Sequence, residues 1–201
     1  MKRLTLAATA ALALLAPLPA QAATIIYTAN LTGGQEVPPT ASTGFGAGLV
    51  TVDDVANTLR VQVVFGGLVS PTTVAHIHCC APAGANAIPA SPVPTFPGFP
   101  AGVTAGAYDQ TFDLTLASSF NPAFITANGG TVASARAALF NGLATSRAYL
   151  NIHSVQFPNG EIRGQLTTAV PEPGTWAMML GGFGFAGWML RRRPRPIPAM
   201  A

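Results

Sequence analysis

The feature that most constrains the fold is the stretch 149–166, in which two alternating runs flank a Pro-Asn-Gly turn at residues 158–160. Glycine after asparagine tolerates the positive φ that a tight turn requires, and a period of two is typical of a half-buried strand. The stretch therefore predicts a β-hairpin. A three-residue loop, with Gly160 in the left-handed conformation, sets the register. It places Ile152 opposite Leu166 and His153 opposite Gln165.

This register separates the hairpin into an apolar face and a polar face. The apolar face carries Leu150, Ile152, Ile162 and Leu166. The polar face carries Tyr149, Asn151, His153, Glu161, Arg163 and Gln165. Two interpretations of the polar face stay open at this stage: a functional site, or the solvated surface of a sheet.

The rest of the chain reads as short strands joined by turns. Apolar alternation and β-branched residues predict strands at 24–31, 45–52, 59–65, 73–79 and 108–116, with the second and third paired as a hairpin. Residues 81–106 lack periodicity and predict a long irregular loop, either functional or a tolerated surface insertion. Helical spacing behind Thr131 predicts one short helix or two between 121 and 143. The expected class is all-β, an antiparallel Greek-key sandwich or barrel with one short helix.

The amino terminus has the pattern of a secretory signal peptide. Lys2 and Arg3 precede an apolar run over residues 4–15, and a small-x-small cleavage site follows at residues 20–22. A signal peptide over 1–22 predicts export across the inner membrane.

The carboxyl terminus has a second targeting pattern. Residues 175–190 carry no charge and are followed by Arg191, Arg192, Arg193 and Arg195, which predicts a short, transient transmembrane helix with the body of the chain outside the cytoplasm. Pro171, Glu172 and Pro173, then Trp176 and the arginine cluster, closely resemble the PEP-CTERM sorting signal of Gram-negative bacteria. The segment 170–195 would be this signal and 196–201 a tail.

The PEP-CTERM resemblance implies recognition by an exosortase and cleavage near the Pro-Glu-Pro triplet. The protein would then lie at the cell surface or outside the cell, near exopolysaccharide or envelope proteins. Without that cleavage it would stay anchored in the membrane.

Charge and length define the central domain once both ends are removed. Residues 23–169 contain four arginines and six carboxylates, a net charge of −2, so the basic isoelectric point comes from the targeting segments. A nucleic-acid function therefore loses its electrostatic basis. About 147 residues form one domain with one core.

Four motifs in fixed order resemble the CHRD domain, first described in chordin and widespread in exported bacterial proteins. They are LTGGQEVPP at 31–39, AHIH at 75–78, AYLNIH at 148–153 and PNGEIRGQL at 158–166. The resemblance covers about residues 24–168 and implies an extracellular β domain. This chain departs from the usual pattern in having Cys79-Cys80 after the histidine pair, and in its long 81–106 loop.

All three histidines of the chain lie within these motifs. The His-x-His spacing places His76 and His78 on one face of a strand, about 7 Å apart at the backbone. His153 would be a third ligand if its strand neighbours theirs, and three histidines with an open position suit copper or zinc. The alternative is a set of half-buried histidines bonded to Glu36, Glu161 or Asn151. Cu/Zn superoxide dismutase chemistry needs more histidines than this chain has.

The remaining reactive residues give weaker signals. Cys79 and Cys80 allow a strained vicinal disulfide, thiolate ligation beside His78, or an intermolecular bridge. Glu36, Glu161 and Arg163 are candidate acid or base groups, although nothing in the sequence fixes two carboxylates at a catalytic separation. The alternative, which we favour, is an ion pair that locks the first loop to the last hairpin.

No nucleophile elbow or phosphate-binding loop is present in the sequence, so we do not expect an enzyme. The first hypothesis is a surface or matrix protein with a binding or structural role. The second is a copper or zinc protein using the three histidines. The third is a protease inhibitor or ligand trap using the long loop.

Overall fold

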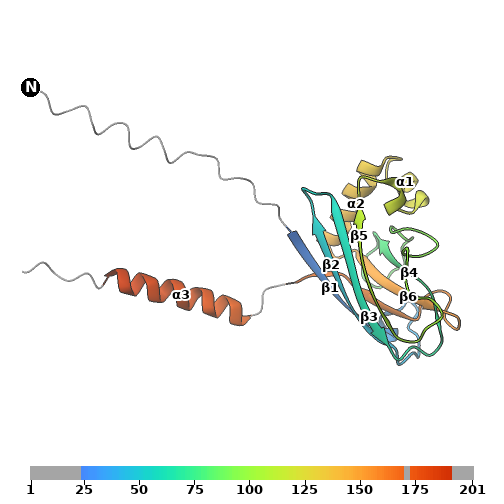
Figure 1. Ribbon diagram of the computed structural model, residues 1–201, viewed down its shortest axis with the longest axis horizontal. Coiled ribbons are helices and arrows are strands. Elements are labelled where there is room, and N and C mark those ends of the chain that lie inside the picture. Colours follow the sequence, from blue (N-terminus) through green and yellow to red (C-terminus); the bar gives the residue numbers. More distant parts are fainter. Residues whose placement is uncertain (1–23, 170–172, 192–201) are drawn as a thin grey trace, which may run out of the picture.

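The computed structural model describes residues 24–169 and 173–191 (Figure 1). The described strands are β1 Thr24–Thr32, β2 Phe45–Asp53, β3 Thr58–Gly66, β4 Thr72–Cys79, β5 Gly106–Asp113, β6 Ala148–Ser154, β7 Ile162–Gln165 and β8 Thr167–Thr168. The described helices are α1 Pro122–Ala127, α2 Val132–Ala144 and α3 Pro173–Arg191, with short 3₁₀ turns at Gly33–Gln35 and Ala117–Ser119.

The strands form one curved sheet in the order β4-β6-β7-β1-β2-β3-β5, with β8 beside β1. Every described pairing is antiparallel, so the antiparallel β character of the expected class is confirmed, although the domain has two short helices and not one. The architecture is a half-barrel, however, rather than two stacked sheets (Figure 1). The predicted pairing of the second and third strands is also confirmed by the β2–β3 register.

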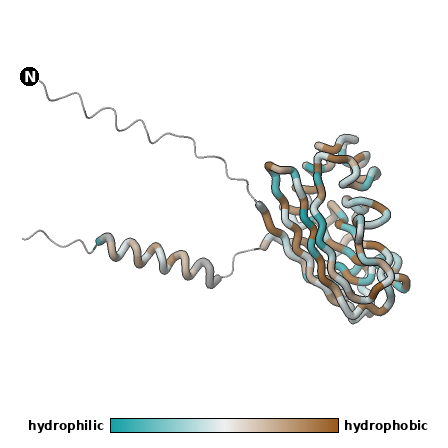
Figure 2. Tube along the Cα trace, viewed as in Figure 1, coloured by the Kyte–Doolittle hydropathy of each residue, from teal (hydrophilic) through white to brown (hydrophobic). Residues whose placement is uncertain are grey.

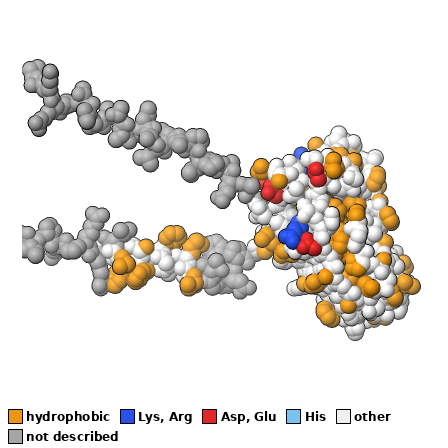
Figure 3. All heavy atoms as spheres, viewed as in Figure 1, with side chains coloured by type: hydrophobic (Ala, Val, Ile, Leu, Met, Phe, Trp, Pro, Cys, Tyr) orange, Lys and Arg blue, Asp and Glu red, His pale blue; other side chains and the backbone are white. Residues whose placement is uncertain are grey.

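Alternation along β1, β2 and β3 decides which side of the sheet holds the core. Leu31, Val50 and Val61 are fully buried, and their sequence neighbours point to the outer face. Figure 2 shows hydrophobic residues along these strands. Figure 3 shows few charged side chains on the visible face of the domain. The one ion pair among the described residues, Arg60–Asp109 at 2.6 Å, is half exposed.

The hairpin at 149–166 exists, but the predicted register was wrong. Ile152 pairs with Ile162 and Asn151 with Arg163, and residues 155–161 form a connection longer than three residues. The shift from the predicted register is four residues, an even number, so each side chain keeps its face. The apolar face is confirmed, since Leu150, Ile152, Ile162 and Leu166 are all fully buried.

The polar face of the hairpin is not a solvated surface. Every residue of β6 is buried, and the long loop after β4 explains why. This loop follows the free edge of β4: Ala90 N donates to Ile77 O at 2.8 Å, and Phe96 N donates to Ala75 O at 3.2 Å. The loop thus protects an edge strand and withdraws the polar face of β4 and β6 from water.

The region predicted to contain one helix or two contains two. Thr131 caps α2 as expected, because its hydroxyl accepts from Ser134 N at 3.1 Å within a capping box. Ala135, Leu139 and Leu143 bury one side of α2 in the core. Both α1 and α2 lie at one end of the sheet (Figure 1).

The targeting segments are described only in part. The signal peptide at 1–22 lies outside the described residues, as do Pro171, Glu172, Arg192 and Arg193. The expected carboxyl-terminal helix is present as α3. Within 24–169 and 173–191, no helix has both the length and the hydropathy needed to cross a membrane.

Gly164 lies where the backbone of β7 passes close to the backbone of β1. A Cβ at this position would lie 2.5 Å from the backbone oxygen of Asn30, whereas a Cβ at Gly34 would meet no described atom within 4 Å. We expect Gly164→Ala to lower the free energy of unfolding by about 2 kcal/mol, because the backbone must shift to relieve the contact. Urea denaturation measures the change, with Gly34→Ala as the matched control. Equal stability of the two variants would contradict this packing.

Candidate metal centre

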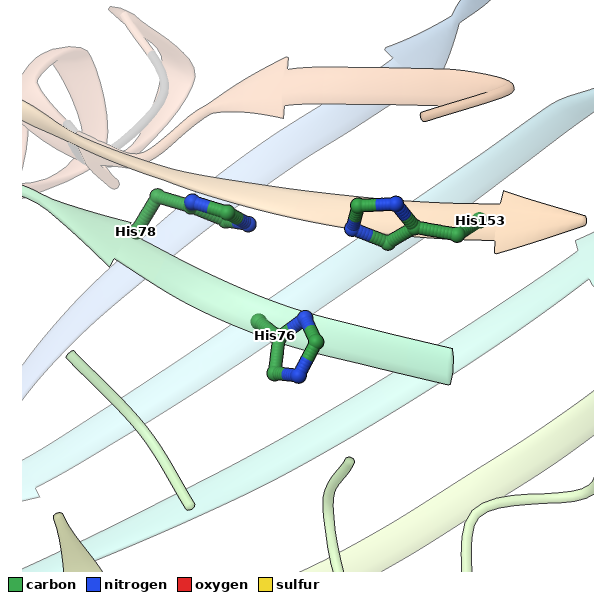
Figure 4. A group of neighbouring side chains, drawn as sticks. All are labelled: His76, His78 and His153. Atoms are coloured by element: carbon green, nitrogen blue, oxygen red, sulfur yellow. The ribbon is translucent and has the colours of Figure 1, made fainter. Parts of the chain in front are cut away.

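The pairing of β4 with β6 brings the three histidines together. The metal hypothesis required these two strands to be neighbours, and they are. His76 pairs with Asn151 and His78 with Tyr149, and His153 lies two residues beyond Asn151 on β6. The ring centroids of the histidines are 5.4 to 6.0 Å apart. Figure 4 shows that one nitrogen of each ring points toward the space between the three rings.

One nitrogen of each imidazole is held by a backbone carbonyl. His76 Nε2 lies 2.7 Å from Pro94 O, His78 Nδ1 lies 2.8 Å from Ala87 O, and His153 Nδ1 lies 2.9 Å from Pro158 O. Because a carbonyl only accepts, each of these nitrogens must carry the proton. The hydrogen bonds therefore fix both the tautomer and the orientation of each ring. The expected alternative, bonds to Glu36, Glu161 or Asn151, is not what the structure shows.

The second nitrogen of each imidazole is free to coordinate. His76 Nδ1, His78 Nε2 and His153 Nε2 are buried, and none has a hydrogen-bond partner among the described residues. One ring nitrogen from each of the three residues lies within 4.8 Å of the others. Three nitrogen lone pairs thus face one another in the protein interior. Burying polar atoms without a partner costs free energy, so these nitrogens call for a ligand that binds them.

Burial keeps these imidazoles neutral. Desolvation lowers the pKa of His76 and of His78 to about 4, against bonds to the carbonyls of Pro94 and Ala87 that would raise it. Desolvation also lowers the pKa of His153. A metal ion binds the neutral form, so no proton has to be displaced at neutral pH.

An aromatic and a cationic side chain close one side of the centre. The ring of Tyr149 stacks on His78, with centroids 4.8 Å apart, and the guanidinium of Arg163 lies 3.6 Å above Tyr149. Arg163 also donates to Asn86 Oδ1 at 2.9 Å and to Ala85 O at 2.8 Å. These contacts attach the long loop to β7.

The predicted ion pair between the glutamates and Arg163 was wrong. Among the described residues, neither Glu36 nor Glu161 lies within salt-bridge distance of Arg163. Hydrogen bonds connect the first loop to the hairpin instead, and the long loop supplies the neutral partners of Arg163. Glu161 Oε1 accepts from Ser42 Oγ and from Val69 N, both at 2.6 Å.

Glu36 reaches the same region from the first loop. Asn151 Nδ2 donates to Glu36 Oε1 at 2.5 Å, close to Gly160, where a Cβ would lie 2.6 Å from both partners. Desolvation raises the pKa of Glu36 to about 7, although the charge of Arg163 and the Asn151 bond lower it. The carboxyl lines a pocket of about 360 Å³, together with residues of the first loop and of the 156–160 turn.

Cys79 and Cys80 form a disulfide between adjacent residues, the first of the three expected alternatives. Both sulfurs lie against Gly142 of α2, where a side chain would collide with them. The disulfide therefore packs beneath the helix, and its sulfurs have no place in the histidine cluster of the described residues.

The sequence did not reveal the groups that orient the histidines. Pro94 and Ala87 act through their backbone carbonyls, which every residue type carries, so no motif could have identified them. Asn151 was assigned to the polar face but not to a metal site. Its position two residues before His153, within the AYLNIH motif, was the one available signal.

An antiparallel β half-barrel with a buried three-histidine cluster is the class of protein that the fold and the cluster define. The family model of the CHRD domain matches residues 27–166, and the chain belongs to this family. The PEP-CTERM protein-sorting motif matches residues 169–193, which implies export, exosortase processing and sorting to the cell surface. Neither curated proteins nor solved structures gave a match.

The lowered histidine pKa values predict a loss of stability in acid for the metal-free domain. Histidine in the unfolded chain has a pKa near 6.5, whereas His76 and His78 in the folded protein have a pKa of about 4. Between these pH values the unfolded chain binds more protons than the folded protein, so acid favours unfolding. The contribution of the two histidines is complete above pH 6.5 and is lost as the pH falls to 4. Glu36 acts in the opposite direction, because its pKa is raised to about 7 in the folded protein. Its contribution to stability is complete below about pH 4.5 and is lost as the pH rises to 7.

A comparison with the variant H76Q/H78Q isolates the histidines, since both proteins retain Glu36. With chelator present, the original protein should lose about 5 kcal/mol more unfolding free energy than the variant between pH 7 and pH 4.5, because each of the two histidines contributes about half of that difference. Urea denaturation at the two pH values gives this difference. An equal loss in both proteins would show that the histidines are not buried and neutral.

Proposed function

We propose that this chain is an exported surface or matrix protein whose CHRD domain binds one zinc or copper ion through His76, His78 and His153. The observation that carries the proposal is the set of three buried ring nitrogens, one from each histidine, without partners among the described residues. A fold that needed these histidines only for packing would have no reason to leave three lone pairs facing one another.

The donor set favours zinc or copper over the hard cations. Imidazole nitrogen suits zinc, copper, iron and nickel, whereas calcium and magnesium prefer oxygen ligands. Histidines whose other nitrogen is bonded to a backbone carbonyl are typical of metal sites, because that bond orients the ring and raises its basicity. The three carbonyls of Pro94, Ala87 and Pro158 supply this arrangement.

We further propose that the ion has a structural or binding role in the cell envelope and that the domain is not an enzyme. His76 and His78 lie on β4, His153 lies on β6, and the carbonyls that orient them come from the long loop and the 155–161 connection. An ion at their centre would join two stretches that are distant in sequence, β4 with the long loop that follows it and β6 with the 155–161 connection that follows it. Binding to the folded state alone adds to its stability.

Metal content tests the proposed site directly. The full chain, produced with its own signal peptide and purified without chelator, should hold about one equivalent of zinc or copper. His78→Ala should lose the ion, because two imidazoles rarely hold zinc tightly. Ser42→Ala is the control, since it removes a hydrogen bond to buried Glu161 but no ligand.

Elemental analysis of the three proteins measures the ratio. An original protein that contains no metal and takes up neither zinc nor copper while folded would refute the site.

Processing at the sorting motif gives a separate prediction. In cells that carry an exosortase, mass spectrometry of the surface protein should find a carboxyl terminus near Pro171-Glu172-Pro173. Replacing Glu172 with Ala should leave the chain uncleaved, because it changes the Pro-Glu-Pro triplet near which cleavage is expected. Thr175→Ala, within the motif but outside the triplet, is the control. Identical termini in all three chains would contradict exosortase processing.

A further inference from the structure

The side-chain amide of Asn151 has a hydrogen-bond partner for its nitrogen but none for its oxygen among the described residues. Nδ2 donates to Glu36 Oε1, whereas Oδ1 is buried and has no hydrogen-bond partner in the described part of the chain. The residue is 2% exposed, so water does not satisfy this oxygen from outside. A buried amide oxygen without a partner costs on the order of 1 to 3 kcal/mol, which calls for a physical explanation.

The strand register places Asn151 among the three histidines. Its direct partner on β4 is His76, and directly paired residues in an antiparallel sheet project from the same face with their Cβ atoms about 5 Å apart. His78 is a diagonal neighbour on β4, and His153 is the next residue on the same face of β6. Asn151 is therefore a neighbour of every residue of the cluster.

The Glu36 bond determines which end of the amide faces the cluster. Glu36 comes from the first loop, and its carboxylate lies against Gly160 in the 155–161 connection. Because the two branches of an amide diverge by about 120°, fixing Nδ2 on Glu36 turns Oδ1 away from that loop. The unpartnered oxygen belongs to a side chain on the same face of the β4–β6 pair as the three histidines, and it is buried as their unpartnered nitrogens are.

We propose that Asn151 is a fourth, positioning member of the metal centre, whose Oδ1 accepts a hydrogen bond from a water molecule on the ion. This inference rests on the proposed metal site. Zinc held by three protein ligands retains an open position that water fills. A bound water has two O–H donors, and Oδ1 is a buried acceptor that lacks a donor. Direct ligation is the less suitable role, since amide oxygen is a ligand preferred by harder cations.

Glu36 and Gly160 have supporting roles in this arrangement. Glu36 holds the amide so that oxygen rather than nitrogen faces the ion, and the absence of a side chain at Gly160 leaves room for the bond. The two motifs that contribute Glu36 and Gly160 are far apart in sequence. Their joint effect is to orient one amide toward three histidines.

Cobalt substitution tests the role of Asn151, because the visible bands of Co²⁺ report the ligands and the geometry of the ion. The full chain, N151L and Q165L are each titrated with Co²⁺ at pH 7. Gln165 is the matched control, since its amide donates to Ser146 O, just before β6, and to Ala148 O, the first residue of β6, and not to a histidine.

We expect N151L to bind Co²⁺ about tenfold more weakly or worse, with shifted bands, and Q165L to retain the original spectrum and affinity. Normal bands and affinity in N151L would overturn the inference and leave the three-histidine site intact. No Co²⁺ or Zn²⁺ binding by the folded original chain would overturn the site itself, and the inference with it.

A second variant covers the case in which N151L does not fold. N151D keeps the shape of the side chain but replaces the Nδ2 donor to Glu36 with an oxygen, so the contact that orients the side chain is lost and the Co²⁺ bands and affinity should both change. Unchanged affinity and bands in N151D would overturn the inference.

Discussion

The constraint on which the site depends is the removal of the polar face of β4 and β6 from water. The loop from residue 81 to 105 follows the edge of β4 and covers that face, so each polar atom there needs a partner inside the protein. Backbone carbonyls of Pro94, Ala87 and Pro158 satisfy one nitrogen of each histidine. The other three nitrogens converge, and a metal ion is the partner that suits three converging imidazoles.

The same constraint explains why the surrounding residues connect distant segments. Glu36 of the first loop accepts from Asn151, Glu161 accepts from Ser42 and Val69, and Arg163 donates to the long loop. Each bond satisfies a buried polar group and attaches one connection to the hairpin. The family motifs that contain these residues are therefore the parts of the chain that enclose the three histidines.

Much of this arrangement could be predicted from the sequence, because alternation is a local signal. It gave the strands, the apolar face of the hairpin and the shared face of His76 and His78. The hairpin register was missed because the 155–161 connection is stabilised by non-local contacts, such as the bond from Val155 N to Pro71 O. The expected ion pair was wrong because Arg163 found neutral oxygen acceptors in a loop without periodicity. The carbonyls that orient the histidines have no side-chain signature and needed the structure.

X-ray absorption spectroscopy at the zinc edge of the zinc-loaded protein tests the central claim most directly. The structure predicts three imidazole nitrogens at about 2.0 to 2.1 Å from the ion, one further light ligand, and no sulfur. Cys79 and Cys80 are joined to each other beneath α2 and so leave the ion to nitrogen. A sulfur ligand at about 2.3 Å, or fewer than three imidazoles, would contradict the account.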